Sequence, residues 1–233
     1  MNYILETAKN IKWESLKDCF GFIDYNVVDI LSNIIDDDPN KREVAYWKLD
    51  NHIVTQGGLS ESCFYILPFL NELVKVTKNR TQILNIIFEI FNGNDTYSNG
   101  NFITIAYDSQ MLPFRYFVPL SLNKEKRLLS SIVTYMEANK NTYLNLLCEV
   151  SCAEELETLL TIILCFRKDS FVKECFYRAK ELKRNKVYKD IFDSFSPDIS
   201  SLDYSASAPN NSIALESAVK VMIAFLVLLV KPV

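Results

Sequence analysis

His52 and Cys63 are the first residues in this sequence whose types could do chemistry together. A cysteine becomes a nucleophile when an imidazole within hydrogen-bond reach takes its proton, and these residues stand 11 positions apart. The spacing does not establish that geometry, so a capping or packing role for His52 beside a turn is the favoured interpretation. His52 is the only histidine and no Cys/His metal-ligand spacing is present, so the sequence predicts no metal site.

Cys148 and Cys152 form a second candidate pair, one helical turn apart and able to share a face. Two thiolates supply only half of a zinc site and no second pair is well placed, so packing in the core is favoured. Most of the 6 cysteines lie in apolar helical patterns and no CxxC pair occurs, which indicates free thiols in a reducing compartment.

Glu154, Glu155 and Glu157 are closely spaced carboxylates that could form an acid/base pair. They open a predicted helix, where acidic side chains complement the positive end of the helix dipole, so capping and solvent-facing roles are favoured. The sequence contains no Walker A loop, no GxGxxG and no GxSxG. We therefore expect no enzyme, no catalytic residue and no cofactor.

The segment from Lys168 to Lys189 holds 8 basic and 3 acidic residues. Such a patch is what a helical nucleic-acid-processing enzyme would need to follow a phosphate backbone. Its apolar residues recur at helical spacing, which favours a surface helix with one buried face. The net charge is −4, and the balance is −5 over residues 1–122 and +1 over the rest, so nucleic acid is disfavoured as the main partner.

Residues 92–120 differ from the rest because they are rich in asparagine, glycine, proline and aromatic residues. We predict an ordered insertion loop here, with a short strand near 102–107 for which the sequence indicates no partner strand. Long loops in compact domains are often functional, and rigid aromatic side chains are typical of interfaces. The predicted partner-binding residues are Asp95, Tyr97, Tyr107, Asp108 and Tyr116. The alternative is that the rings of this loop fold inward and fill the core.

The elements around these candidates are predicted to be helices, because apolar residues recur with a period near 3.6 and glycine is scarce at 5 residues. The expected ranges are 3–20, 25–35, 41–54, 60–77, 80–91, 122–138, 141–150, 152–167, 169–184, 186–194 and 212–230, with a polar linker at 196–211. Gln56-Gly57-Gly58 predicts a turn, and Pro68 lies inside a helix. Successive pairs predict an all-α domain over 1–233, built as an α-solenoid of stacked antiparallel helix pairs.

Two segments bear on localisation. The N-terminus lacks the basic and apolar regions of a signal peptide. Charged residues interrupt the apolar stretch from Ile213 to Val230, and the clean run from Val221 is about half of the ~20 residues that span a bilayer. We expect a buried terminal helix, no membrane association and a cytoplasmic protein.

A resemblance adds to these inferences. Trp47 and Leu49 precede a Gln56-Gly57 turn, and Leu67-Pro68-Phe69-Leu70 and Ile86–Gly93 follow it. Residues 43–93 thereby resemble a segment of bacterial HEAT-repeat-like proteins, several of which are described as toxin-immunity proteins. The resemblance implies stacked helix pairs and carries no catalytic residue. In physical terms, Trp47 and Phe69 would fill the groove between two helices, and Gly57 would permit the turn.

The leading hypothesis is a non-catalytic protein-binding module, an immunity protein that neutralises a cognate bacterial toxin domain by covering its active site. The alternative from another class is a HEAT-like nucleic-acid-binding or processing enzyme that uses the 168–189 segment. A generic scaffold protein is the third hypothesis.

Overall fold

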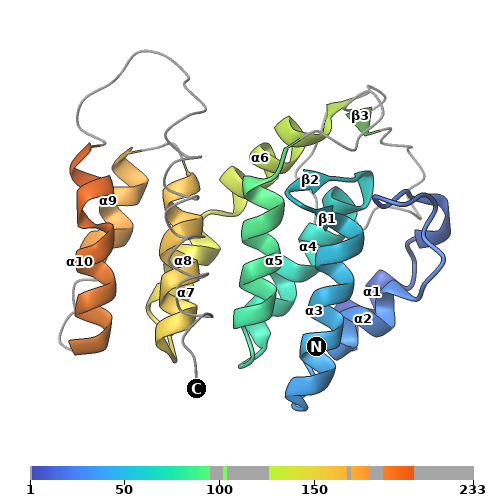
Figure 1. Cartoon of the computed structure of the whole chain (residues 1–233), viewed down its shortest axis with the longest axis horizontal. Helices are drawn as coiled ribbons and strands as arrows, with labels where there is room; N and C mark the ends of the chain where they lie inside the picture. The colour runs from blue at the N-terminus through green and yellow to red at the C-terminus, as the bar shows by residue number, and fades with distance from the viewer. Residues whose placement is uncertain (1, 95–101, 104–125, 167–168, 179–185, 202–233) are drawn as a thin grey trace, which may run out of the picture. The chain divides into compact units, whose positions relative to one another are not determined.

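The computed structural model describes residues 2–94, 102–103, 126–166, 169–178 and 186–201. The chain divides into two compact units, Met1–Phe166 and Arg167–Val233. The predicted all-α class is confirmed, since the described elements are helices apart from two short two-stranded ladders (Figure 1). That residues 1–233 form one domain stays a prediction.

The elements of the first unit, in chain order, are α1 Asn2–Ala8, the 3-10 helix η1 Trp13–Ser15, α2 Val27–Asn33, α3 Pro39–Ile53, β1 Val54–Thr55, β2 Gly58–Leu59, α4 Glu61–Val76, α5 Thr81–Asn92, β3 Phe102–Ile103, β4 Lys126–Arg127, α6 Leu128–Asn139, α7 Asn141–Leu147 and α8 Ala153–Cys165. The second unit contains α9 Asp169–Arg178 and α10 Lys186–Ser201. None of the described helices is long and apolar enough to cross a bilayer.

The first predicted helix, 3–20, is wrong beyond its first two turns. α1 ends at Ala8, where the Trp13 indole Nε1 donates a hydrogen bond to the Ala8 carbonyl at 2.9 Å. This side-chain bond occupies a carbonyl that a continuing helix would use for its own backbone. The Trp13 ring is buried and meets Phe69 edge-on, with centroids 5.9 Å apart. The chain therefore turns so that Trp13 can enter the core.

α3 and the turn that follows it form as the sequence predicts, whereas the two short strands on either side of that turn were not predicted. Asp38 caps α3 by accepting a hydrogen bond from the Asn40 amide at 2.9 Å, and Pro39 opens the helix. β1 and β2 then pair antiparallel through a turn in which Gln56 has φ 52° and Gly57 has φ 76°. Two consecutive positive φ values define the tight turn that matches the twist of a hairpin, which is why glycine suits position 57.

α4 and α5 supply most of the core of the first unit. α4 is buried along almost its whole length, with Pro68 inside it, and α5 buries all of its isoleucine and leucine side chains. α5 contacts α3 on one side and α8 on the other, while α4 contacts α5, α6 and α7. In Figure 1, α3, α5 and α8 accordingly lie side by side.

Four expectations for the second half need correction. The strand at Phe102–Ile103 does have a partner, because β4 pairs with it antiparallel where a helix from 122 was expected. β3 and β4 are separated by residues 104–125, so no local sequence pattern indicates that they pair. α10 continues through Pro197 to Ser201, so residues 196–201 are helix and not linker; one interior proline removes a single hydrogen bond and does not by itself end a helix.

Cys148 and Cys152 are exposed and cap two different helices, α7 and α8, so neither lies in the core.

Glu155 is the fourth correction, since it is buried and not a solvent group. Its carboxylate accepts hydrogen bonds from the Ser151 amide at 2.9 Å and the Ser151 hydroxyl at 2.7 Å. The Arg80 guanidinium, just before α5, lies 3.3 Å from the same carboxylate and 2.7 Å from that of Glu149. This network joins the start of α5 to the start of α8, and it offsets the cost of burying a charge there.

Replacing Glu155 with alanine should lower the free energy of unfolding by about 2–4 kcal/mol, because Arg80 and Ser151 lose their shared acceptor. Urea unfolding followed by circular dichroism measures this. Glu154→Ala is the matched control, since Glu154 is exposed in the same helical turn and should cost about 0.5 kcal/mol or less. Equal losses in the two variants would show that the network does not stabilise the fold.

Candidate functional site

The five residues predicted from sequence to bind a partner, Asp95, Tyr97, Tyr107, Asp108 and Tyr116, lie outside the described residues. The two hypotheses for this segment, an interface or a core plug, therefore stay predictions. The described residues direct attention instead to α3 and the loop that packs on its C-terminal end.

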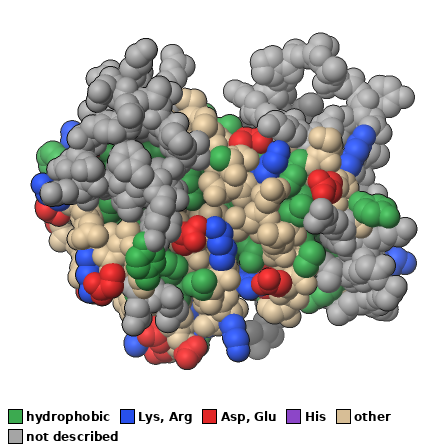
Figure 2. Space-filling model, turned by 180° about the vertical axis from the view of Figure 1, so that it is seen from behind, with side chains coloured by type: hydrophobic (Ala, Val, Ile, Leu, Met, Phe, Trp, Pro, Cys, Tyr) green, Lys and Arg blue, Asp and Glu red, His purple; other side chains and the backbone are tan. Residues whose placement is uncertain are grey.

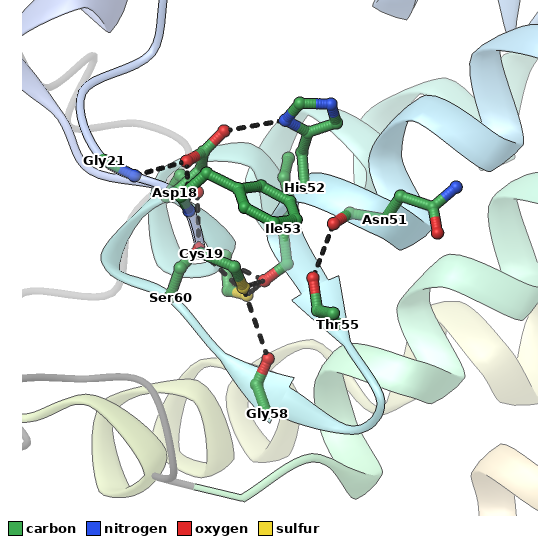
Figure 3. Close-up of polar contacts among 12 residues, drawn as sticks. Asp18, Cys19, Gly21, Asn51, His52, Ile53, Thr55, Gly58 and Ser60 are labelled. Atoms are coloured by element: carbon green, nitrogen blue, oxygen red, sulfur yellow. Dashed lines mark hydrogen bonds and ion pairs between the residues drawn. The ribbon is translucent and has the colours of Figure 1, made fainter.

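His52, at the end of α3, is held by a buried carboxylate. The imidazole Nδ1 lies 3.0 Å from Asp18 Oδ2, and the Asp18 side chain is only 4% exposed against 31% for His52 (Figure 3). The other Asp18 oxygen accepts hydrogen bonds from the backbone amides of Phe20 and Gly21. Asp18 thus closes a turn of its own loop and ties that loop to α3 through His52.

The same turn presents two phenylalanines to solvent. Phe20 and Phe22 are 72% and 64% exposed, although the loop that carries them is fixed by the Asp18 bonds and by the Cys19 amide, which donates to the His52 carbonyl at 2.8 Å. The Phe20 and Tyr25 rings meet His52 edge-on at 5.3 and 4.9 Å. Exposed aromatic rings on a rigid loop bind with little loss of conformational entropy, which suits a contact surface.

Tyr25 lies on the inner side of this cluster. Burial, followed by the negative charge of Asp18, raises the pKa of Tyr25 well above its usual value, so the phenol stays neutral. The Lys48 ammonium lies over the Tyr25 ring at 4.7 Å. This cation–π contact engages one of the few positive charges of α3.

The Cys–His nucleophile hypothesis finds no geometric support at Cys63. This thiol is fully buried and donates to the Ile53 carbonyl at 2.9 Å, whereas His52 contacts Asp18. Burial raises the pKa of the Cys63 thiol, which is the opposite of what a nucleophile needs. The Cys19 thiol faces the Ile53 and Gly58 carbonyls, and in Figure 3 the second ring nitrogen of His52 points away from it.

The outward side of α3 exposes two large apolar side chains among its polar residues. Val44 is 68% and Trp47 51% exposed, while Ala45, Leu49 and Ile53 form the buried side. The prediction that Trp47 fills a groove with Phe69 is therefore wrong, and Trp13 takes that place against Phe69. Helical periodicity locates faces but does not say which of two apolar faces packs inward.

A pair of carboxylates lies between α3 and α5, beside Trp47. Burial, followed by the charge of Asp50, raises the pKa of Glu89, and burial also raises that of Asp50. The pKa of Tyr46 rises to about 12, mainly through burial, with both carboxylates contributing. Neither acid forms an ion pair within the described part of the chain. The sequence did not indicate Asp50 and Glu89 as a pair, because they come together only when α3 packs on α5.

The described residues give no support to a metal site and little support to a nucleic-acid-binding surface. No three His, Cys, Asp or Glu residues among them are grouped to hold a metal ion. In α9, Phe171, Val172 and Cys175 are buried and Lys173 and Glu174 are exposed, which confirms a helix with one buried face. Figure 2 shows acidic and basic side chains interspersed over the described surface on that side of the molecule, with neither sign gathered into one patch.

Comparison with known proteins gives no relative: no family model, no curated protein and no solved structure matches the chain.

Asp18→Ala should free the loop that carries Phe20 and Phe22, because two backbone amides and His52 lose their acceptor. We expect a loss of about 1–3 kcal/mol in the free energy of unfolding and faster chymotrypsin cleavage after Phe20 or Phe22. Asp24→Ala, at an exposed carboxylate nearby, should change neither quantity appreciably. Unchanged cleavage in Asp18→Ala would contradict the role given to this carboxylate.

Glu89→Gln should stabilise the protein at pH 7, by about 0.5–1 kcal/mol. Since folding raises the pKa of Glu89, the folded state binds more protons than the unfolded chain between the ordinary pKa of 4.5 and the raised value. Stability therefore falls as the pH rises through that window, and the penalty persists above it. The advantage of Glu89→Gln should vanish below about pH 4, where the wild-type carboxyl is protonated in both states.

Urea unfolding of both proteins at pH 7 and pH 3.5 measures this pH dependence. Glu14→Gln, at an exposed site, is the control and should show no such pH-dependent advantage. A destabilised Glu89→Gln at pH 7 would contradict the assignment of an electrostatic penalty to Glu89.

Proposed function

We propose that this chain is a non-catalytic protein-binding module, and that it is an immunity protein which neutralises a bacterial toxin domain. The observation that carries the proposal is the outer face of α3, where Val44 and Trp47 stand exposed and the carboxylates of Asp50 and Glu89 form no ion pair with any described residue. Tryptophan is the residue type most enriched at the energetic centres of interfaces. This face lies within residues 43–93, the segment that carries the resemblance to HEAT-repeat-like immunity proteins.

A HEAT-like solenoid is the architecture we propose for the first unit. The contacts support it in two ways: α2 packs on α3, α4 on α5 and α7 on α8 as sequential pairs, and α3, α5 and α8 contact one another in that order. Such stacking exposes one helix of each pair along a continuous surface, which helical-repeat proteins use for binding. The outer face of α3 would lie at one end of that surface.

The charge of the chain supports a partner with a basic surface. Residues 1–122 carry 10 Lys and Arg against 15 Asp and Glu, a balance of −5. Toxin domains that act on nucleic acids present basic active sites, because phosphate binding requires positive charge. An acidic module that covers such a site gains affinity and association rate from complementary potentials. Its free cysteines suit the cytoplasm, where we propose that it acts.

Co-expression tests the proposal. The toxin to use is the one encoded by the reading frame adjacent to this gene, and its expression alone should arrest bacterial growth. We expect this chain to restore growth and to copurify with the toxin as a stable complex. Absence of both rescue and complex formation would count decisively against an immunity function, and salt-dependent binding of DNA or RNA by the chain alone would favour the nucleic-acid alternative.

Trp47→Ala should weaken toxin binding about 30-fold or more, as loss of an interface hot spot does, with a change of under about 1 kcal/mol in the free energy of unfolding. Calorimetry and urea unfolding measure the two quantities. Val76→Ala and Val133→Ala are the controls, because both valines are exposed on other helices, α4 and α6. Equal binding by all three variants would place the interface elsewhere.

A further inference from the structure

One stripe of α3 combines an exposed indole with carboxylates on either side of it. Glu43, Trp47 and Asp50 follow one another at spacings of four and three residues, so they share a face of the helix. Tyr46 packs edge-on against Trp47, with ring centroids 5.1 Å apart. The charge of Glu89, on α5, helps to raise the pKa of Tyr46, and the charge of Asp50 helps to raise the pKa of Glu89. We call these five residues the α3 stripe.

The positive charges of α3 are engaged elsewhere. Lys41 pairs with Asp36 at 2.9 Å, and the Arg42 guanidinium donates to the carbonyls of Asp36 and Asp37. Lys48 lies over the Tyr25 ring. Glu43, Asp50 and Glu89 therefore have no cation partner within the described part of the chain, unlike Glu72 and Glu155, which pair with Lys75 and Arg80.

We infer that the α3 stripe binds an arginine side chain presented by the partner protein, an inference that rests on the proposed function. A guanidinium can stack on the Trp47 indole while its N–H groups donate to the Asp50 and Glu89 carboxylates in the bidentate manner that a planar fork allows. The exposed Val44 then contacts the apolar stem of that side chain or its neighbours. Charge complementarity selects this occupant, because an anionic or purely apolar partner would leave half-buried carboxylates unpaired.

Binding also changes the protonation balance in the expected direction. A cation beside Asp50 and Glu89 favours their charged forms and lowers pKa values that burial has raised. The partner's arginine thus relieves a cost that the free protein carries, and this relief is part of the binding free energy.

The probe for this inference is a hexa-arginine peptide amide, titrated into the full chain and followed through the indole N–H signals in nitrogen-15 NMR spectra. The chain has two tryptophans, and Trp13 is 6% exposed against 51% for Trp47, so each reports a different environment. We expect the Trp47 signal to shift and saturate while the Trp13 signal stays still. Trp47→Phe assigns the signal, and a hexa-citrulline peptide, neutral but similar in shape, should produce no saturable shift.

The double variant Asp50→Asn/Glu89→Gln should bind the arginine peptide about tenfold more weakly, as expected for lost charge-assisted hydrogen bonds. Glu14→Gln/Glu154→Gln makes the same change in net charge at exposed sites on η1 and α8 and should bind within about twofold of wild type. Circular dichroism establishes that both variants fold. Equal weakening in the two variants, a shift of Trp13 alone, or equally tight binding of hexa-lysine would overturn the assignment of an arginine site.

Toxin neutralisation separates this inference from the proposed function. Full rescue by Asp50→Asn/Glu89→Gln, with wild-type affinity for the toxin, would overturn the α3 stripe as the arginine site and leave the immunity function standing. Saturable peptide binding at Trp47 without rescue from the adjacent toxin would uphold the arginine site and overturn the immunity function.

Discussion

The burial of α5 is the constraint on which the rest of the first unit depends. Ile83, Leu84, Ile86, Ile87 and Ile90 are fully buried, because α3, α4, α6 and α8 all contact this helix. Burial of each such side chain contributes about 1.5–3 kcal/mol. A single neighbouring helix could not bury all five side chains, so several helices must pack around α5. The position of α3 follows from this requirement, since α3 covers one flank of α5 while its Val44 and Trp47 side chains stay exposed.

The few polar groups of α5 show what that burial costs. On the side of α8, Asn85 accepts a hydrogen bond from the Thr158 hydroxyl at 2.9 Å, and Arg80 neutralises Glu155 just before the helix begins. On the side of α3, Glu89 faces Asp50 and Tyr46, and burial raises the pKa of both acids. Among the described residues, Glu155 on the α8 side of α5 thus has a cation partner and Glu89 and Asp50 on the α3 side have none, which is why the α3 side is the candidate site.

Local patterns were enough to predict most of the helices but not the partners of their side chains. Asp38-Pro39, Gln56-Gly57 and the apolar repeats of α4 and α5 act through neighbours in sequence, so these elements could be predicted. Other features depend on residues outside the local pattern. α1 ends where Trp13 bonds to it, and Glu155 is buried because Arg80 pairs with it. Trp47 is exposed because the opposite side of α3 packs on α5. The site therefore could not be found from the sequence, although its residues lie within the segment that carries the resemblance.

Stability alone does not explain why Asp50 and Glu89, which have no cation partner in the described part of the chain, are charged residues. Glutamine at position 89 would keep the shape and hydrogen-bonding capacity of the side chain without the charge that burial disfavours. Elsewhere in the chain a buried carboxylate does have a cation partner, because Arg80 pairs with Glu155. The fold can therefore supply a cation to a buried acid. Free energy retained as strain or desolvation in a folded protein is released when a ligand of the right charge arrives, and sites that bind are often less stable than their surroundings for this reason. A surface of this composition is disfavoured in the isolated chain and favoured in a complex, and that difference is what a binding module requires.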